Sequence, residues 1–347
     1  MKKIVLLLLL PAYCIAQLPD YYTYYESVDF NLSGEAIKAQ LATLVTETHT
    51  TELIYTPGVW DALKQTDLDP ENNENVLLIY GYDDTDGVDD TDRSRDKDLS
   101  CHTSSCAGLW VREHVFPRSL GNPNLEFEGP GSDAHHLRAI DSERNSMRSN
   151  RRFADGEGHS IAISGGFFYP GDEWRGDVAR MMMYMYIRYG QQCEANVVGS
   201  GSSSYSTLGD MPNIFLEWNA EDPVSQYEKN RNDILQDMQG NRNPFIDDPY
   251  IATIIWDGPA AEDTWGTLAT QMAVAQNFFV YPTVTEGTVY VNNAPENTTY
   301  TLYNSLGQRI NVTATANTIE LEGNAKGMYF LSADSEAMHQ TVKLILK

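Results

Sequence analysis

The sequence predicts an α+β protein of two domains, a mainly helical domain followed by a small all-β sandwich. Three observations lead to this fold class. Apolar side chains recur with a helical period in several segments before residue 240. One short apolar run, "NVLLIYGY" (75–82), is typical of a buried strand. After residue 276, short alternating runs are separated by Gly, Asn and Pro. A chain of 347 residues also exceeds the usual size of one domain.

The N-terminus reads "MKKIVLLLLLPAYCIAQ". Two lysines, an apolar run and a small-residue site ending at Ala16 predict a signal peptide over residues 1–16. The apolar run is too short to span a bilayer, which takes roughly 20 residues. No later segment resembles a membrane helix, so we expect an exported protein without stable membrane insertion.

The first domain is expected over residues 17–257. Its first helix lies in 32–49, where Ser33 is a plausible N-cap and four side chains form an apolar stripe: Ile37, Leu41, Leu44 and Val45. A second helix, "GDVARMMMYMYIRYG" (176–190), ends at a glycine, and its methionines and tyrosines are expected in the core. A third covers 222–239, before a polar turn.

The segment "DDTDGVDDTDRSRDKD" (83–98) is too acidic to bury and too rich in Asp and Gly for a helix. Clustered carboxylates in a loop could bind calcium. Their spacing misses the EF-hand pattern, so a solvated loop is favoured over a calcium site.

The cysteines fit an exported protein. Cys101 and Cys106 lie close together in "CHTSSC", and an oxidising compartment favours a local disulfide between them. Cys193 is then either an isolated buried thiol or has another partner. A metal site formed by Cys101, His102 and Cys106 lacks a fourth ligand nearby.

The stretch "WVREHVFPRSL" (110–120) sets a carboxylate beside an imidazole. On an extended segment Glu113 and His114 point to opposite faces, so they are not obviously a pair with one role. At a bend or strand end, Glu113 could bind a hard metal while His114 acts as a base. Pro117 prevents an undisturbed helix here.

A basic cluster follows in "DAHHLRAIDSERNSMRSNRR" (133–152), although the formal net charge of the chain is −25. If 141–153 is helical, Asn145, Arg148 and Arg152 share one face, and Ile140 and Met147 lie on the other. An amide and two guanidinium groups would then project together. The acidic remainder should repel nucleic acid, so any attraction must be local.

This arrangement suits phosphodiester hydrolysis. Glu113 and the Asn145 amide oxygen would bind Mg²⁺, which takes few protein ligands and keeps several waters. Arginines would bind the phosphate oxygens, and His114 would deprotonate the attacking water.

Four motifs resemble, in order, the secreted endonuclease I family: "EHVFPRS", "DAHHLRAIDSERNSMRSN", "GDVARMMMYM" and "DPVSQYEKNRNDILQDMQGNRNPFIDDP". The resemblance covers roughly residues 20–256. It implies a ββα-metal nuclease core that cuts DNA, and often RNA, with little sequence preference and leaves 5′-phosphate ends.

The resemblance implies His114 as general base and Glu113 and Asn145 as ligands of Mg²⁺, with Ca²⁺ or Mn²⁺ as alternative metals. Members of the family commonly have Asn where this chain has His136. The phosphate-binding arginine of the well-studied members has no clear counterpart, so the candidates are Arg148, then Arg118, with Arg152 on the same predicted face.

Residues 258–276 are expected to be a linker and 277–347 a β-sandwich. The tail resembles the C-terminal sorting domain of the type IX secretion pathway through "FFVYPTVTEGTVYV", "YTLYNSLGQRI", "KGMYFLSA" and "TVKLILK". It implies the type IX secretion machinery as a partner, and export to the periplasm followed by passage across the outer membrane. A permanent sandwich that binds sugar or protein is the alternative for this tail.

Two other functions compete with a nuclease. A calcium-stabilised surface adhesin would use the acidic loop 83–98 and the β tail, but does not need the Asn145 face. A glycan hydrolase would use two carboxylates, yet 49 acidic residues make such pairs uninformative.

Overall fold

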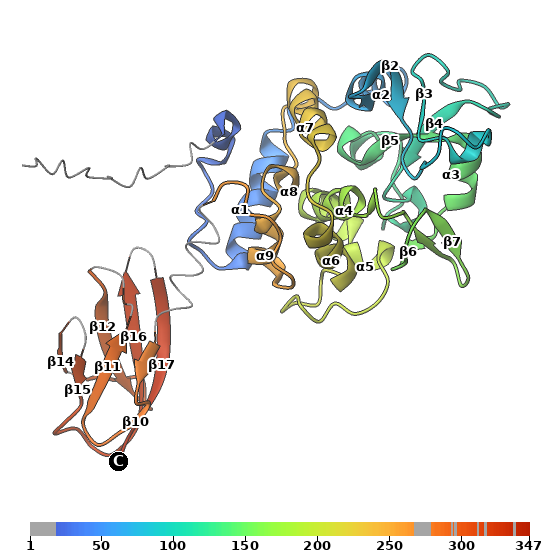
Figure 1. Cartoon of the computed structure of the whole chain (residues 1–347). Coiled ribbons are helices and arrows are strands. Elements are labelled where there is room, and N and C mark those ends of the chain that lie inside the picture. The colour runs from blue at the N-terminus through green and yellow to red at the C-terminus, as the bar shows by residue number, and fades with distance from the viewer. Residues whose placement is uncertain are drawn as a thin grey trace, which may run out of the picture.

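The computed structural model describes residues 19–266 and 279–347, except 293, 295–296, 311, 316–317 and 336–337. The predicted signal peptide lies outside the described residues, as does most of the predicted linker. The first domain mixes helices and strands, and its sheets are small (Figure 1). Within the described ranges, no helix combines the length and hydrophobicity needed to cross a bilayer.

The helices of the first domain are α1 (Gly34–Glu47), α2 (Gly58–Thr66), α3 (Ser142–Arg148), α4 (Arg175–Tyr189), α5 (Ala195–Val198), α6 (Asn213–Glu221), α7 (Gln226–Gln239), α8 (Pro244–Asp247) and α9 (Tyr250–Trp256). Its strands are β1 (Leu68–Asp69), β2 (Asn72–Leu77), β3 (Ser94–Asp96), β4 (Trp110–His114), β5 (Leu137–Asp141), β6 (Arg152–Phe153), β7 (Ile161–Ile163) and β8 (Phe167–Tyr169). They form the sheets β1-β2-β3, β4-β5 and β6-β8-β7.

Helix α4 is the centre of the core. It is buried along most of its length, including Met181–Met185, and it contacts α1 and α6. In Figure 1 the helices α1, α8 and α9 gather on one side of α4, and the strands β2 to β5 lie on the other. The core role predicted for the methionines of this segment is confirmed.

The other predicted helices also form, with differences at their ends. In α1 the side chains of Ile37, Leu41 and Val45 are buried, but Ser33 makes no capping hydrogen bond. Helix α7 begins with a capping box of Ser225 and Glu228.

The strand expected at 75–82 ends at Leu77, and the buried chain continues beyond it. The helix expected over 141–153 ends at Arg148, because Ser149 takes a positive φ of 51°.

The predicted linker does not begin at residue 258. Trp265 is 2% exposed and its ring packs edge-on against Tyr22 and Phe30, with centroid distances of 4.9 and 5.3 Å. Residues up to 266 therefore belong to the first domain. An aromatic ring buried against the N-terminal segment is a tertiary contact that the linker-like composition of 258–276 does not reveal.

The C-terminal part contains β9 (Phe279–Tyr281), β10 (Val284–Thr285), β11 (Thr288–Asn292), β12 (Thr299–Asn304), β13 (Arg309–Ile310), β14 (Thr313–Ala314), β15 (Thr318–Glu320), β16 (Gly327–Ser335) and β17 (Met338–Leu346). Two sheets, β10-β17-β16-β12-β13 and β14-β15-β11-β9, share one cluster of buried, mostly aliphatic side chains. This cluster has no residue in common with the core around α4.

Buried ionic contacts fix β5 against the helices. Arg138 of β5 is fully buried, and its Nη1 lies 2.9 Å from Asp177 Oδ2 on α4. Its Nη2 donates to the hydroxyl of Tyr227 on α7 at 2.8 Å. Because burying a charge without a partner is costly, these contacts hold the strand in one place and one register.

A second polar network ties the segment before β5 to the turn after α7. The carboxylate of Asp133 accepts from Gln239 Nε2 at 2.9 Å and from the Tyr184 hydroxyl at 2.7 Å. His135 Nε2 lies 3.2 Å from the carbonyl oxygen of Asn241. The motifs "DAHHL" and "QGNRN" are therefore in contact through buried polar groups.

The burial of His135 predicts a pH-dependent stability. Desolvation lowers the pKa of this imidazole to about 4, below the value of about 6.5 in an unfolded chain. The folded-state pKa is the depressed one, so the stabilisation is complete above pH ~6.5 and is lost as the pH falls toward 4. At about 1.4 kcal/mol per pKa unit, this one group should remove about 3 kcal/mol of unfolding free energy.

Urea unfolding at pH 7.5 and pH 4.5 measures this loss. His135→Gln removes the titration, so its stability should fall less over the same interval, by about 2–3 kcal/mol. Equal losses in the variant and the parent would contradict the assignment.

Candidate active site

Of the predicted site residues, Glu113 and His114 lie on β4, and Asn145 and Arg148 lie on α3. Strand β5 connects these two elements, because it pairs with β4 and leads into α3. The strands pair antiparallel, with Glu113 opposite Arg138 and His114 opposite Leu137. The helix follows β5 without a loop, because Asp141 is both the last residue of β5 and the N-cap of α3. Its carboxylate accepts two free backbone N–H groups of the first turn. Two strands and a helix are thereby joined into one compact unit.

A cleft of about 410 Å³ opens where β4 ends beside α3. It brings together the predicted Glu113, His114, Asn145 and Arg118. The described residues that line it are Arg112, Glu113, His114, Pro117, Arg118, Ser119, Asn145, Ser149 and Asn150. Glu113 and His114 both reach this cleft although they are neighbours on a strand.

Glu113 is almost completely buried, with 3% of its surface exposed. Its Oε1 lies 3.2 Å from Arg148 Nε and accepts a hydrogen bond from the Tyr80 hydroxyl at 3.4 Å. Desolvation raises the pKa of this carboxyl to about 7, and the nearby Arg148 charge opposes that rise. A cation in the cleft would favour the ionised form, so the carboxylate suits a metal ligand.

His114 is held as a neutral imidazole. Burial lowers its pKa to about 3, and the neighbouring His136 adds to this effect. Nε2 lies 3.0 Å from the carbonyl oxygen of Gly131, which can only accept a hydrogen bond. Nε2 must therefore carry the proton, which leaves the lone pair on Nδ1 as the acceptor. The ring also stacks on Tyr55 with an interplanar angle of 24°.

Asn145 lies in the middle of α3 and lines the cleft. Among the described residues, its side-chain amide has no hydrogen-bond partner, so its oxygen is available to a ligand. One carboxylate and one amide oxygen at the same cleft are hard donors of the kind Mg²⁺ accepts while it keeps several waters. The donor set therefore fits the metal that the family resemblance implies.

Arg148 is placed differently from the expectation of a phosphate contact. Its side chain is fully buried, and it stacks on Phe153 with its guanidinium carbon 4.6 Å from the ring centroid. Nη2 donates to the Val115 carbonyl at 2.8 Å and Nη1 donates to the Ser149 carbonyl at 2.9 Å. With Nε also within ion-pair distance of Glu113, the guanidinium contacts groups of the protein itself and links α3 to β4.

Arg152 does not share the Asn145 face, because α3 has ended before it. It lies on β6, and its Nη2 donates to the carbonyl oxygens of Asn196 and Gly199. Arg152 is not one of the described residues that line the cleft. The prediction that one helix runs through 141–153 is wrong beyond Arg148, because the positive φ of Ser149 ends the helix there.

Arg112 lines the cleft but was not among the sequence candidates. Its guanidinium carbon lies 3.5 Å from the ring centroid of Tyr55 and 4.3 Å from that of Trp60. Within the described part of the chain it forms no ion pair with a carboxylate; its hydrogen bonds go to the Tyr55 carbonyl and the Thr56 hydroxyl. The signal available in the sequence was its position directly before Glu113.

Arg118 also lines the cleft, and it is half-buried. Its Nε donates to the Leu125 carbonyl at 2.6 Å, and its Nη2 lies 3.7 Å from the exposed carboxylate of Glu126. A contact at that distance with an exposed partner is weak, so Arg118 keeps capacity to bind an anion.

The alternative metal sites lack a suitable ligand set. Cys101 and Cys106 form a disulfide, and Cys193 is a buried free thiol. In the described ranges, no group of three or more His, Cys, Asp or Glu side chains is arranged to hold a metal ion, the acidic loop 83–98 included. In this acidic loop the carboxylate of Asp84, for example, accepts hydrogen bonds from the backbone N–H groups of Arg93 and Ser94.

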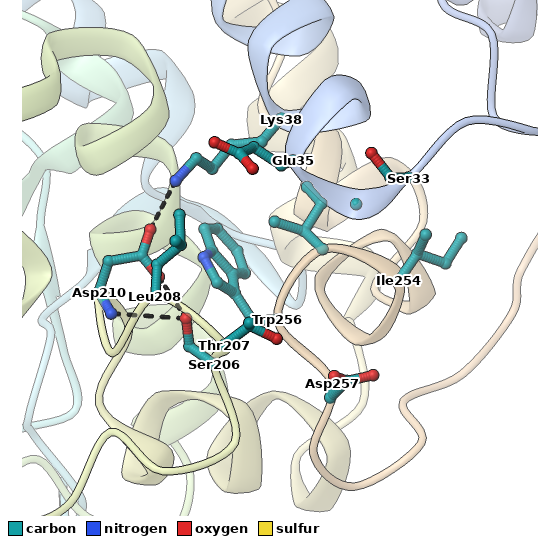
Figure 2. A pocket seen from close by; sticks show the side chains of 12 residues that line it. Ser33, Glu35, Lys38, Ser206, Thr207, Leu208, Asp210, Ile254, Trp256 and Asp257 are labelled. Carbon is teal, nitrogen blue, oxygen red and sulfur yellow. Dashed lines mark hydrogen bonds and ion pairs between the residues drawn. The ribbon is translucent and has the colours of Figure 1, made fainter. Parts of the chain in front are cut away.

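A second pocket, of about 350 Å³, lies between α1, α9 and the segment 206–210 (Figure 2). Lys38 and Asp210 point toward each other there, with Nζ 2.5 Å from Oδ2. Among the described residues that line it there is no histidine, and its lysine is already paired. We therefore take the cleft beside α3 as the candidate active site.

The chain is similar to known families and proteins over both of its parts. The family model for endonuclease I matches residues 33–250, and a model for a secretion system C-terminal sorting domain matches residues 279–347. An extracellular ribonuclease of Bacillus subtilis (strain 168) is 40% identical over 250 residues, which cover 68% of this chain and 79% of its own length.

An extracellular ribonuclease of Bacillus amyloliquefaciens is 41% identical over 250 residues, which cover 68% of this chain and 79% of its own length. A periplasmic deoxyribonuclease of Aeromonas hydrophila is 27% identical over 134 residues, or 36% of this chain and 51% of its own length.

The burial of Arg148 predicts a structural effect of its removal. Arg148→Met leaves the Glu113 charge buried without its partner, which typically costs 3–5 kcal/mol of unfolding free energy. Arg151→Met is the matched control, because Arg151 is half-buried and bonds only backbone carbonyls of α3. We expect its effect to stay within about 1 kcal/mol. Urea unfolding compares the two, and a parent-like stability of Arg148→Met would contradict the assigned role.

Proposed function

This chain belongs to the endonuclease I family and carries a C-terminal secretion sorting domain, and we propose that it is a secreted, metal-dependent endonuclease that hydrolyses phosphodiester bonds of DNA and RNA with little sequence preference. One observation carries the proposal: Glu113, His114 and Asn145, from a strand and a helix, line a single cleft.

His114 acts as the general base in this proposal. Its Nδ1 accepts a proton from the water that attacks the phosphorus atom, while Nε2–H remains bonded to the Gly131 carbonyl and keeps the ring oriented. In the absence of substrate, a pKa of about 3 keeps the His114 imidazole neutral. The negative charge of a bound phosphodiester would raise that pKa and assist the transfer.

Glu113 and Asn145 would hold Mg²⁺, or Ca²⁺ or Mn²⁺ in its place. When bound, such an ion polarises the phosphate and stabilises the negative charge on the leaving oxygen. The ion pair with Arg148 keeps the Glu113 carboxylate in position. Departure of the 3′ oxygen would leave a 5′-phosphate on the product.

Arg112 and Arg118 take the role of phosphate contacts. Arg112 has the stronger claim, because it lines the cleft and has no carboxylate partner among the described residues. A guanidinium presents several N–H donors in one plane and can bind two phosphate oxygens at once.

We propose DNA and RNA alike as substrates, because the phosphodiester on which the proposed residues act is common to both. The relatives are named as ribonucleases and a deoxyribonuclease. We propose export through the signal peptide 1–16, followed by passage through the type IX secretion machinery, with the sorting domain as the address.

The base assignment predicts a specific loss. His114→Ala should reduce plasmid and RNA cleavage by at least a hundredfold, since a general base contributes about 10²–10⁴ in rate. His159→Ala is the matched control, because His159 is exposed and stacks on Tyr82 outside the cleft. Parent cleavage should be abolished by EDTA and restored by Mg²⁺. Full cleavage by His114→Ala, with parent-like thermal unfolding, would refute the role of this imidazole.

The ligand assignment predicts weaker metal binding. Glu113→Gln and Asn145→Ala should each shift the Mg²⁺ concentration that gives half-maximal cleavage upward by tenfold or more, because each removes one of the two protein ligands. Calorimetric titration of Mg²⁺ reports the same change without catalysis. Unchanged titrations in both variants would remove these residues as ligands.

The phosphate assignment predicts the salt dependence of binding. In duplex DNA each neutralised phosphate adds about 0.9 to the slope of log K against log salt. Arg112→Ala and Arg118→Ala should each reduce the slope by about that amount. Arg188→Ala, a half-buried arginine outside the cleft whose Nη1 bonds Thr46, should not. A parent slope typical of ten contacts would contradict the idea that a few cleft arginines supply the attraction.

A further inference from the structure

A rim of two aromatic side chains, Tyr55 and Phe127, borders the candidate active site. Their ring centroids are 4.5 Å apart, and the Tyr55 ring also stacks on His114 at 5.6 Å. The two rings come from the segment before α2 and from the loop that precedes β5, so residues distant in sequence meet here. We call Tyr55 and Phe127 the aromatic rim.

The two arginines of the cleft hold this rim. The guanidinium carbon of Arg112 lies 3.5 Å from the Tyr55 centroid, and that of Arg118 lies 3.8 Å from the Phe127 centroid. Arg118 also fixes the Phe127 loop through its bond to the Leu125 carbonyl. Cation–π contacts of this kind order the rings before any ligand arrives.

Phe127 is nevertheless 50% exposed. A large aromatic ring that is held in place by its neighbours, yet keeps half of its surface in water, gains little for the fold from that exposed half. Its position beside the Arg118 guanidinium favours a ligand that combines a flat apolar surface with negative charge. A nucleotide has both features.

We propose that an unpaired base of the substrate strand, next to the scissile phosphate, packs on the aromatic rim, so that this site prefers single-stranded nucleic acid to duplex. The proposal rests on the function proposed above. Arg112 and Arg118 contact both the cleft and the rim, and a nucleotide whose phosphate they bind would bring its base toward Tyr55 and Phe127.

Two physical arguments favour a single strand. In a duplex each base is stacked on its neighbours and paired across the helix, so its face is not available to a protein ring. A net charge of −25 also opposes the dense charge of a duplex more than that of a single strand. Stacking supplies affinity without requiring further cationic side chains, of which the cleft has few.

The test compares cleavage of a single-stranded oligonucleotide with cleavage of the same sequence as a duplex. Phe127→Leu keeps an apolar side chain but removes the aromatic face. Loss of one base stack, worth about 1–3 kcal/mol, corresponds to a fall of about fivefold to 150-fold in kcat/KM on the single strand. The duplex value should change less than twofold. Ile54→Ala is the matched control, since Ile54 is 72% exposed and lies next to Tyr55 in the chain.

A binding measurement separates stacking from catalysis. The His114→Ala protein is mixed with a single-stranded oligonucleotide that contains 2-aminopurine, whose fluorescence is quenched when it stacks. Quenching should appear in this protein and be lost when Phe127→Leu is added to it. Equal quenching in both proteins, or equal loss of cleavage on the two substrates, would overturn the proposal.

The two proposals fail in different ways. If the parent cuts no nucleic acid in the presence of Mg²⁺, the proposed function is wrong. If the parent cuts both substrates and Phe127→Leu leaves the ratio of their kcat/KM values unchanged, only the base contact is wrong. A parent that prefers the duplex also rejects the base contact and leaves the nuclease function intact.

Discussion

The buried ion pair between Arg148 and Glu113 is the interaction on which the candidate site depends. It joins the helix that bears Asn145 to the strand that bears Glu113 and His114. Its two charges are both withdrawn from water, so each is tolerated only because the other is present. The pair therefore sets the distance between the proposed metal ligands, and it does so before any metal binds.

The same principle extends through the first domain. Among the described residues, five arginines are at most 2% exposed: Arg138, Arg148, Arg180, Arg231 and Arg242. Each has a carboxylate partner within 3.2 Å, as in the pair of Arg180 with Glu228 at 2.7 Å. These cations hold the interior together and contribute little positive potential at the surface. In the proposed function, attraction of a polyanion therefore falls to Arg112 and Arg118 at the cleft, although the protein as a whole is strongly acidic.

The functional parts of the chain are modular. The sorting domain has its own buried cluster, with no residue in common with the core around α4. A unit that buries its own apolar surface can fold and be recognised without the enzyme, as an address for export requires. The end of the first domain packs against its beginning, because the Trp265 ring contacts Tyr22 and Phe30.

The sequence by itself determined the long helices and the β tail and singled out Glu113 and His114, because periodic patterns and adjacent motifs report contacts made along the chain. It also indicated Asn145 beside them. Only the tertiary structure decided what each arginine does.

An arginine side chain is long enough to reach either water or a buried carboxylate, and the choice depends on groups supplied by distant segments. Arg148 meets Glu113 and is buried, Arg152 leaves the helix after Ser149, and Arg112 is turned to the cleft by Tyr55 and Trp60. No local pattern distinguishes these three outcomes, because their partners come together only when the chain folds.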